Sequence, residues 1–192
     1  MPNQILIEKY ARLAVRTGAN VQKGQLVVIR TTTDAVELTR AVAKEAYLAG
    51  AKRVHLIWND EYISRYGYDY ADIENLKEVP QYSIDQYQYF VDQGACFISI
   101  LSPIPNVLSG VDGKKLQEVT YASQKALQFF REHTMGNKTQ WTLVAAANEK
   151  WAAKLFPTMD VKEATEKLWD AIFKACRIDL ENDPVETWKN HN

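Results

Sequence analysis

The sequence predicts an α/β fold, a three-layer domain in which helices cover both faces of a mostly parallel β-sheet with Rossmann-like topology. First, residues 25–30 and 54–58 are short apolar runs rich in β-branched residues, as in buried parallel strands. Second, apolar residues between these runs recur at helical spacing, so residues 24–58 have the pattern of a right-handed β-α-β unit. Third, two more strand-like runs follow, at residues 95–101 and 141–147.

Two helices are predicted before the second strand. An apolar stripe predicts an opening helix that Gly18 ends; the stripe consists of Leu6, Tyr10, Leu13 and Thr17. Asp34 and Glu37 have the spacing of a capping box, so Asp34 is the predicted N-cap of a helix that ends at Gly50. The tyrosine-rich residues that follow the second strand are predicted to form short helices.

The second half of the chain is predicted to be mainly helical. A helix that begins at Ser83 or Asp85 precedes the third strand, and the longest helix is predicted for residues 112–133. Further helices are expected at residues 148–157 and 160–176, and Asp183 followed by proline predicts the start of a last one. We expect residues 1–182 to form an amino-terminal α/β domain and residues 183–192 to begin the connection to a carboxy-terminal domain beyond this sequence.

Composition excludes several classes of function. The formal net charge is -1, so the chain lacks the basic surface that binds nucleic acid or an anionic membrane. No apolar run approaches the ~20 residues needed to span a bilayer, and the first residues lack a signal-peptide pattern. Cys96 and Cys176 stand among apolar neighbours, as buried reduced thiols do. We therefore expect a cytoplasmic protein with no nucleic-acid or membrane partner.

Recognisable catalytic and cofactor motifs are missing from the sequence. The first strand-to-helix turn contains no glycine, and neither a dinucleotide fingerprint nor a P-loop occurs. His55, His133 and His191 fall in three separate predicted elements without metal-ligand spacing. We therefore predict no catalytic residue, no metal ligand and no cofactor in this chain.

Polar residues at the carboxyl ends of the predicted strands are the remaining site candidates, because ligands of parallel sheets bind there. These residues are Thr32, Asp34, Asn59, Asp60, Glu61, Ser102 and Asn148. Asp60 and Glu61 are adjacent, so their side chains diverge, and a solvated helix start is favoured over a catalytic pair. One hypothesis is that the chain is a stand-alone α/β module that binds a small ligand at these strand ends or has a regulatory role.

A second hypothesis comes from a family resemblance. In order and spacing, several segments resemble metalloaminopeptidases of the aminopeptidase T, aminopeptidase S and PepS type. The segments are residues 13–18, 21–25, 46–52, 58–61, 94–100, 167–177 and 182–188. Together they span nearly the whole chain, although no single one is a strong motif.

The resemblance implies a cytoplasmic, usually homodimeric enzyme that releases N-terminal residues from peptides. It implies two divalent metal ions (Zn, Co, Mn or Mg), held by glutamate, histidine, tyrosine and aspartate side chains of a carboxy-terminal domain that this sequence does not include. The peptide substrate would bind through that domain. The 192 residues would then be a non-catalytic amino-terminal domain, inactive alone, that helps to wall the substrate cavity.

Overall fold

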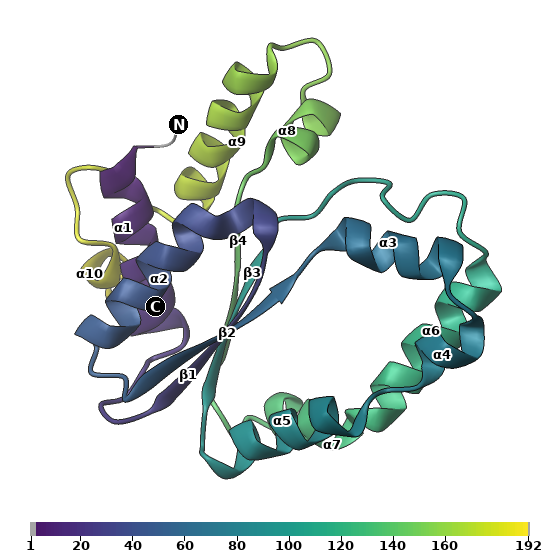
Figure 1. Ribbon diagram of the computed structural model, residues 1–192. Helices are drawn as coiled ribbons and strands as arrows, with labels where there is room; N and C mark the ends of the chain where they lie inside the picture. Colours follow the sequence, from purple (N-terminus) through teal and green to yellow (C-terminus); the bar gives the residue numbers. More distant parts are fainter. Residues whose placement is uncertain (1–2, 192) are drawn as a thin grey trace. The chain divides into compact units, whose positions relative to one another are not determined.

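The computed structural model describes residues 3–191 and contains a four-stranded, all-parallel sheet in the order β2-β1-β3-β4 (Figure 1). The strands are β1 (Leu26–Thr32), β2 (Arg53–Asn59), β3 (Cys96–Leu101) and β4 (Trp141–Ala145). In β1, Ile29 lies opposite Leu56 of β2 and Ile98 of β3. The predicted α/β fold with a parallel sheet is confirmed.

The described chain divides into two compact units, and the sheet belongs to the first. Unit 1 comprises Met1–Asn59, Cys96–Pro105 and Gln140–Asn192, and unit 2 comprises Asp60–Ala95 and Asn106–Thr139. The helical segments of unit 1 are α1 (Gln4–Leu13), the π-helical turn η1 (Ala14–Gly18), the 3-10 turn η2 (Thr33–Ala35), α2 (Val36–Leu48), α8 (Glu149–Leu155), α9 (Val161–Ala175) and α10 (Pro184–Lys189).

One hydrophobic core joins the sheet of unit 1 to its helices. Val27 and Ile29 of β1 are fully buried, and they share the core cluster with Leu38 of α2, Tyr10 of α1 and Phe173 of α9. Burying each large aliphatic side chain contributes roughly 1.5–3 kcal/mol, so this shared core is the main force that holds α1, α2 and α9 on the sheet.

Unit 2 is helical and has a thin core. It contains α3 (Glu61–Tyr70), α4 (Ile73–Lys77), α5 (Gln81–Asp92), α6 (Gly113–Ala126) and α7 (Gln128–Met135). The rings of Tyr87 and Phe130 lie 4.7 Å apart, and Phe90 packs edge-on against Tyr87. Lys115 of α6 donates hydrogen bonds to the carbonyls of Tyr68 and Ala71, which satisfies acceptors at the end of α3.

Three predicted helix boundaries are wrong. Helix α2 begins after the 3-10 turn that contains Asp34, and its N-cap is Ala35, so Asp34 does not cap it. Helix α5 begins at Gln81, directly after a proline, rather than at Ser83 or Asp85. The predicted helix 112–133 is two helices that meet at Leu127, where the backbone leaves helical geometry (ψ 23°); no glycine or proline in the sequence marks this break.

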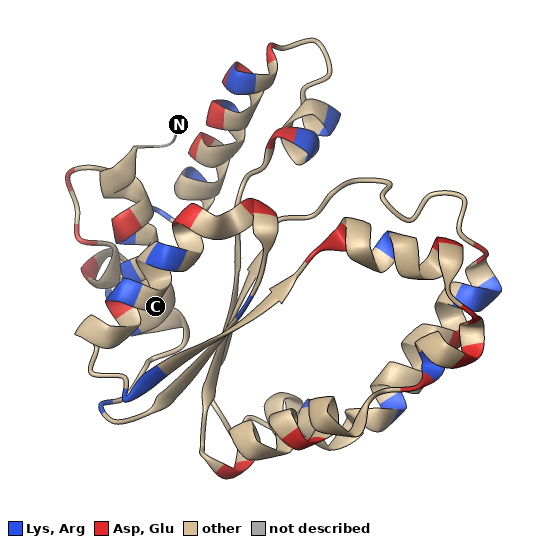
Figure 2. Ribbon diagram, in the orientation of Figure 1, with Lys and Arg blue, Asp and Glu red and all other residues tan. Residues whose placement is uncertain are grey.

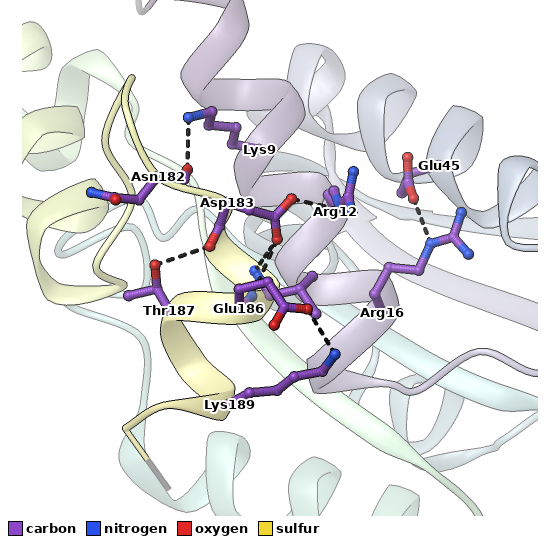
Figure 3. A network of polar contacts seen from close by, with 10 residues as sticks. Lys9, Arg12, Arg16, Glu45, Asn182, Asp183, Glu186, Thr187 and Lys189 are labelled. Carbon is purple, nitrogen blue, oxygen red and sulfur yellow. Dashed lines mark hydrogen bonds and ion pairs between the residues drawn. The ribbon is translucent and has the colours of Figure 1, made fainter.

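Helix α10 is docked on α1 by polar contacts (Figure 3). The carboxylate of Asp183 accepts two main-chain hydrogen bonds in the first turn of α10, as the sequence predicts for an N-cap, and Arg12 of α1 pairs with it at 3.1 Å. The Lys9 ammonium donates to the carbonyl of Asn182. The indole N–H of Trp188, in the same helix, donates to the carbonyl oxygen of Cys176 at 2.8 Å.

Charged residues of both signs are interspersed on the helices, whereas the strands carry few (Figure 2). Among residues 3–191, no helix has the length and apolar character required to cross a bilayer.

We predict that a charge placed in the sheet is far more damaging than one placed on a helix surface. Ile98 is fully buried, so Ile98→Asp should lower the free energy of unfolding by about 3 kcal/mol or more, and Val28→Asp should behave alike. The Lys114 side chain is 82% exposed, so Lys114→Asp should change it by ~0.5 kcal/mol or less. Urea denaturation followed by circular dichroism measures all three, and equal losses would refute the strand assignments.

We also predict that α10 opens more readily than the sheet. It is six residues long, and a helix shorter than ~12 residues depends on its tertiary contacts. Amide hydrogen exchange in α10 should therefore be faster than in β1. Exchange as slow as that of β1 in a monomeric sample would contradict this.

Candidate functional site

The carboxyl ends of the strands in unit 1 hold most of the predicted site residues. The chain leaves β1 toward β2 on one side, and β3 lies on its other side, so the topological switch point, where parallel sheets bind ligands, lies between β1 and β3. The predicted residues in unit 1 are Thr32, Asp34, Asn59, Ser102 and Asn148; Asp60 and Glu61 belong to unit 2.

Ser102 and Asn148 are brought together by the structure. The Asn148 amide donates to the Ser102 hydroxyl at 2.9 Å and to the carbonyl oxygen of Pro103 at 3.0 Å. Its amide oxygen caps α8 by accepting the N–H of Trp151. Both side chains are buried. The pair therefore braces the loops after β3 and β4, and this hydrogen bonding already engages the groups that a ligand would need.

The threonines at the end of β1 are also mostly turned inward. Thr39 donates to the carbonyl oxygen of Ala35, so in the 2.8 Å contact between the Thr31 and Thr39 hydroxyls the proton comes from Thr31. The hydroxyl oxygen of Thr32 is buried and has no hydrogen-bond partner within residues 3–191. A buried hydroxyl without a hydrogen-bond partner lowers the stability of the fold, and solvent does not reach this one.

Asp34, Asn59, Asp60 and Glu61 occupy three local environments. Asp34 and Asn59 are exposed, in η2 and at the end of β2. Asp60 is the N-cap of α3, and its carboxylate accepts the N–H groups of Tyr62 and Ile63 at 2.9 and 3.1 Å. Glu61 occupies the first turn of the same helix. The predicted helix-start interpretation of Asp60 and Glu61 is confirmed.

Sequence reasoning missed a polar contact in the middle of the sheet. Arg30 of β1 donates from two guanidinium nitrogens to the Ser99 hydroxyl of β3, at 2.8 and 3.1 Å. Its guanidinium carbon also lies 5.9 Å from the centre of the Phe97 ring, within the range of a cation–π contact. The one available signal was a lone arginine at the end of an apolar run; the strand register, which sequence does not provide, pairs it with Ser99.

Burial raises the pKa of both cysteine thiols and of one tyrosine hydroxyl in unit 1. Desolvation raises the pKa of the Cys96 thiol to about 12 and also raises the pKa of the Cys176 thiol. The pKa of the Tyr10 hydroxyl is raised by burial too, and this hydroxyl accepts the N–H of Ala145 at 3.0 Å. Because thiolate is the reactive form of cysteine, a raised pKa lowers the reactivity of both thiols at neutral pH.

The donor set of the described chain does not fit a two-metal hydrolytic centre. Residues 3–191 contain no group of three or more histidine, cysteine, aspartate or glutamate side chains placed to hold a metal ion. Such a centre needs several carboxylates and imidazoles within bonding distance, roughly 2.0–2.2 Å for zinc with nitrogen or oxygen. No catalytic step through a metal is therefore assigned to these residues.

Comparisons with known proteins show which family this chain matches. A model of the family described as thermophilic metalloprotease (M29) matches residues 3–192. The chain is 39% identical over 186 residues to aminopeptidase AmpS of Bacillus subtilis (strain 168), a match that covers 97% of this chain and 45% of that protein. Aminopeptidase PepS of Streptococcus thermophilus is 37% identical, with 96% and 45% covered.

A solved structure agrees with these matches. Wild-type AmpT from Thermus thermophilus superimposes with a TM-score of 0.87 at 30% identity, over 97% of this chain and 45% of that one. The chain thus spans about 45% of the length of the curated relatives it matches.

We predict that Asn148 matters for stability rather than for ligand binding. Asn148→Ala removes the cap of α8 and leaves the buried Ser102 hydroxyl without this donor, so it should lower the free energy of unfolding by ~1–3 kcal/mol. Asn59→Ala, at an exposed strand end, is the matched control and should change it by ~0.5 kcal/mol or less. Chemical denaturation measures both; an unaltered Asn148→Ala variant would refute the bracing role.

Proposed function

The chain belongs to the thermophilic metalloprotease family, and from this membership we propose that it is the non-catalytic amino-terminal domain of a metal-dependent aminopeptidase that releases N-terminal residues from peptides. The observation that carries the proposal is the family match over residues 3–192 together with the relatives, which are named aminopeptidases and are more than twice as long as the matched region.

The chemistry of the described residues supports a non-catalytic role. Metal ions in a hydrolytic centre supply an activated water and polarise the scissile carbonyl. Residues 3–191 contain no group of three or more ligating side chains that could hold them, and burial raises the pKa of both thiols. The two divalent ions (Zn, Co, Mn or Mg) and their ligands are therefore assigned to the part of the relatives that this chain does not match.

The domain would contribute shape to the substrate cavity. Exposed Asp34 and Asn59 are available for contact at the ends of β1 and β2, whereas Ser102 and Asn148 act indirectly because they hold the loops after β3 and β4 in place. Thr32, at the end of β1, completes the wall residues proposed in unit 1, and Asp60 and Glu61 are proposed as cavity-wall residues of unit 2. A rigid wall is useful because hydrolysis depends on a substrate held in one geometry.

The remaining features of the proposal concern the whole enzyme. Residues 1–182 form the domain and residues 183–192 begin its connection to the catalytic part. The enzyme is a cytoplasmic homodimer, and the peptide binds mainly to the catalytic domain. A stand-alone module that binds a small ligand is less well supported, because the buried polar groups after β3 and β4 are already hydrogen-bonded to each other.

The test is a peptidase assay on two samples, residues 1–192 and the whole product of the gene. Each is incubated with zinc, cobalt, manganese or magnesium and an aminoacyl p-nitroanilide, with and without EDTA. The whole product should show metal-dependent turnover that EDTA abolishes. Residues 1–192 should show none, and EDTA should leave their melting temperature unchanged because no metal holds the domain together.

Variants of residues 1–192 test whether any turnover depends on residues of this chain. Turnover by residues 1–192 that is abolished by Asp60→Asn or Glu61→Gln, but not by Glu74→Gln in the exposed part of α4, would place catalysis here and overturn the proposal. A fall in melting temperature on adding EDTA would reveal a structural metal.

A further inference from the structure

An apolar groove of about 560 Å³ runs along the free edge of the sheet in unit 1. Its floor is β4, one side is formed by α1 and η1, and the other by the end of α9 and by Trp188 of α10. Small residues create the space: Ala14, Gly18, Ala145 and Ala175 all line it. Within the described residues, the lining contains no aspartate, glutamate, lysine or arginine, so the groove suits an uncharged apolar surface.

The strand beneath the groove is an edge without the usual protection. The Gln140 carbonyl accepts the N–H of Phe97, and the Ala146 N–H donates to the carbonyl of Leu101. The alternate residues Leu143 and Ala145 therefore direct their main-chain groups away from β3. The Tyr10 hydroxyl accepts the N–H of Ala145. Leu143 remains 54% exposed. Edge strands are normally shielded by charges, proline or bulges, and β4 contains no charged residue and no proline.

A fifth parallel strand connected to β4 directly through α9 is not expected in the groove. Helices α2 and α9 pack on the same face of the sheet, in one core. The crossover from β1 through α2 moves toward β2, so a crossover through α9 that continued outward from β4 would have the opposite, left-handed sense. Such connections are right-handed in about 98% of cases. The next strand of this sheet is therefore not expected to reach β4 through α9, and the uncharged lining of the groove suits a packed apolar surface.

The relatives contain polypeptide that is available to cover this surface. More than half of each relative lies outside the matched region, and the last described helix, α10, forms one wall of the groove. We propose that the groove and the exposed edge at Leu143 are the docking surface for an apolar patch of the carboxy-terminal domain of the same polypeptide. This inference rests on the proposed function, because it requires that domain.

The experiment compares matched lysine variants by melting temperature. Leu143→Lys and Ala175→Lys put a charge into the groove, and Leu180→Lys puts one at a site of unit 1 that is 55% exposed and does not line it. In residues 1–192, all three should melt within ~1 °C of the parent, because each site faces solvent. In the whole gene product, both groove variants should melt ~3 °C or more below the parent, and Leu180→Lys should not.

Equal melting of the groove variants and Leu180→Lys in the whole gene product would overturn the docking surface. The proposed function is judged separately, by metal-dependent peptidase activity of the unsubstituted product. An active enzyme whose groove variants melt normally rejects the docking surface alone, and an inactive product rejects the aminopeptidase assignment.

Discussion

The burial of β1 is the constraint on which the rest of the structure depends. A strand enclosed by neighbours on both sides must give every main-chain N–H and C=O a partner, because water cannot reach them. β1 meets this need by pairing with β2 and β3, which places Val27 and Ile29 at the centre of the core. Because its neighbours run parallel to it, their carboxyl ends lie beside its own, and the candidate residues of unit 1 follow these strand ends.

The buried polar groups at these strand ends also need hydrogen-bond partners, and most find them within unit 1. The Asn148 amide joins two loops, and the hydroxyls of Thr31 and Thr39 form a chain to a helix carbonyl. A group already satisfied in this way has little left to offer a substrate or a metal ion. The buried polar groups at the strand ends therefore support the loops, which is consistent with a domain that shapes a cavity rather than one that performs hydrolysis.

The sequence predicted what depends on local pattern and missed what depends on contacts between distant segments. Apolar runs located all four strands to within one or two residues, and the short polar side chains of Asn148, Asp160 and Asp183 cap helices as expected. Asp34 was assigned wrongly as a cap because a 3-10 turn separates β1 from α2. The Arg30–Ser99 contact requires the register of two strands 69 positions apart, which no local pattern contains.

The two edge strands, β2 and β4, differ in how their outward-facing main-chain groups are protected. On β2, the N–H of Val54 donates to the Tyr47 hydroxyl and the strand begins with an exposed arginine, a charge that discourages pairing with another chain. On β4, Tyr10 protects Ala145 in the same way, but no charge follows. Exposing an uncharged edge strand and an adjoining, mostly apolar groove to water is unfavourable, because apolar surface is poorly hydrated. The asymmetry between these edges therefore favours β4, rather than β2, as the side that is covered in a longer chain.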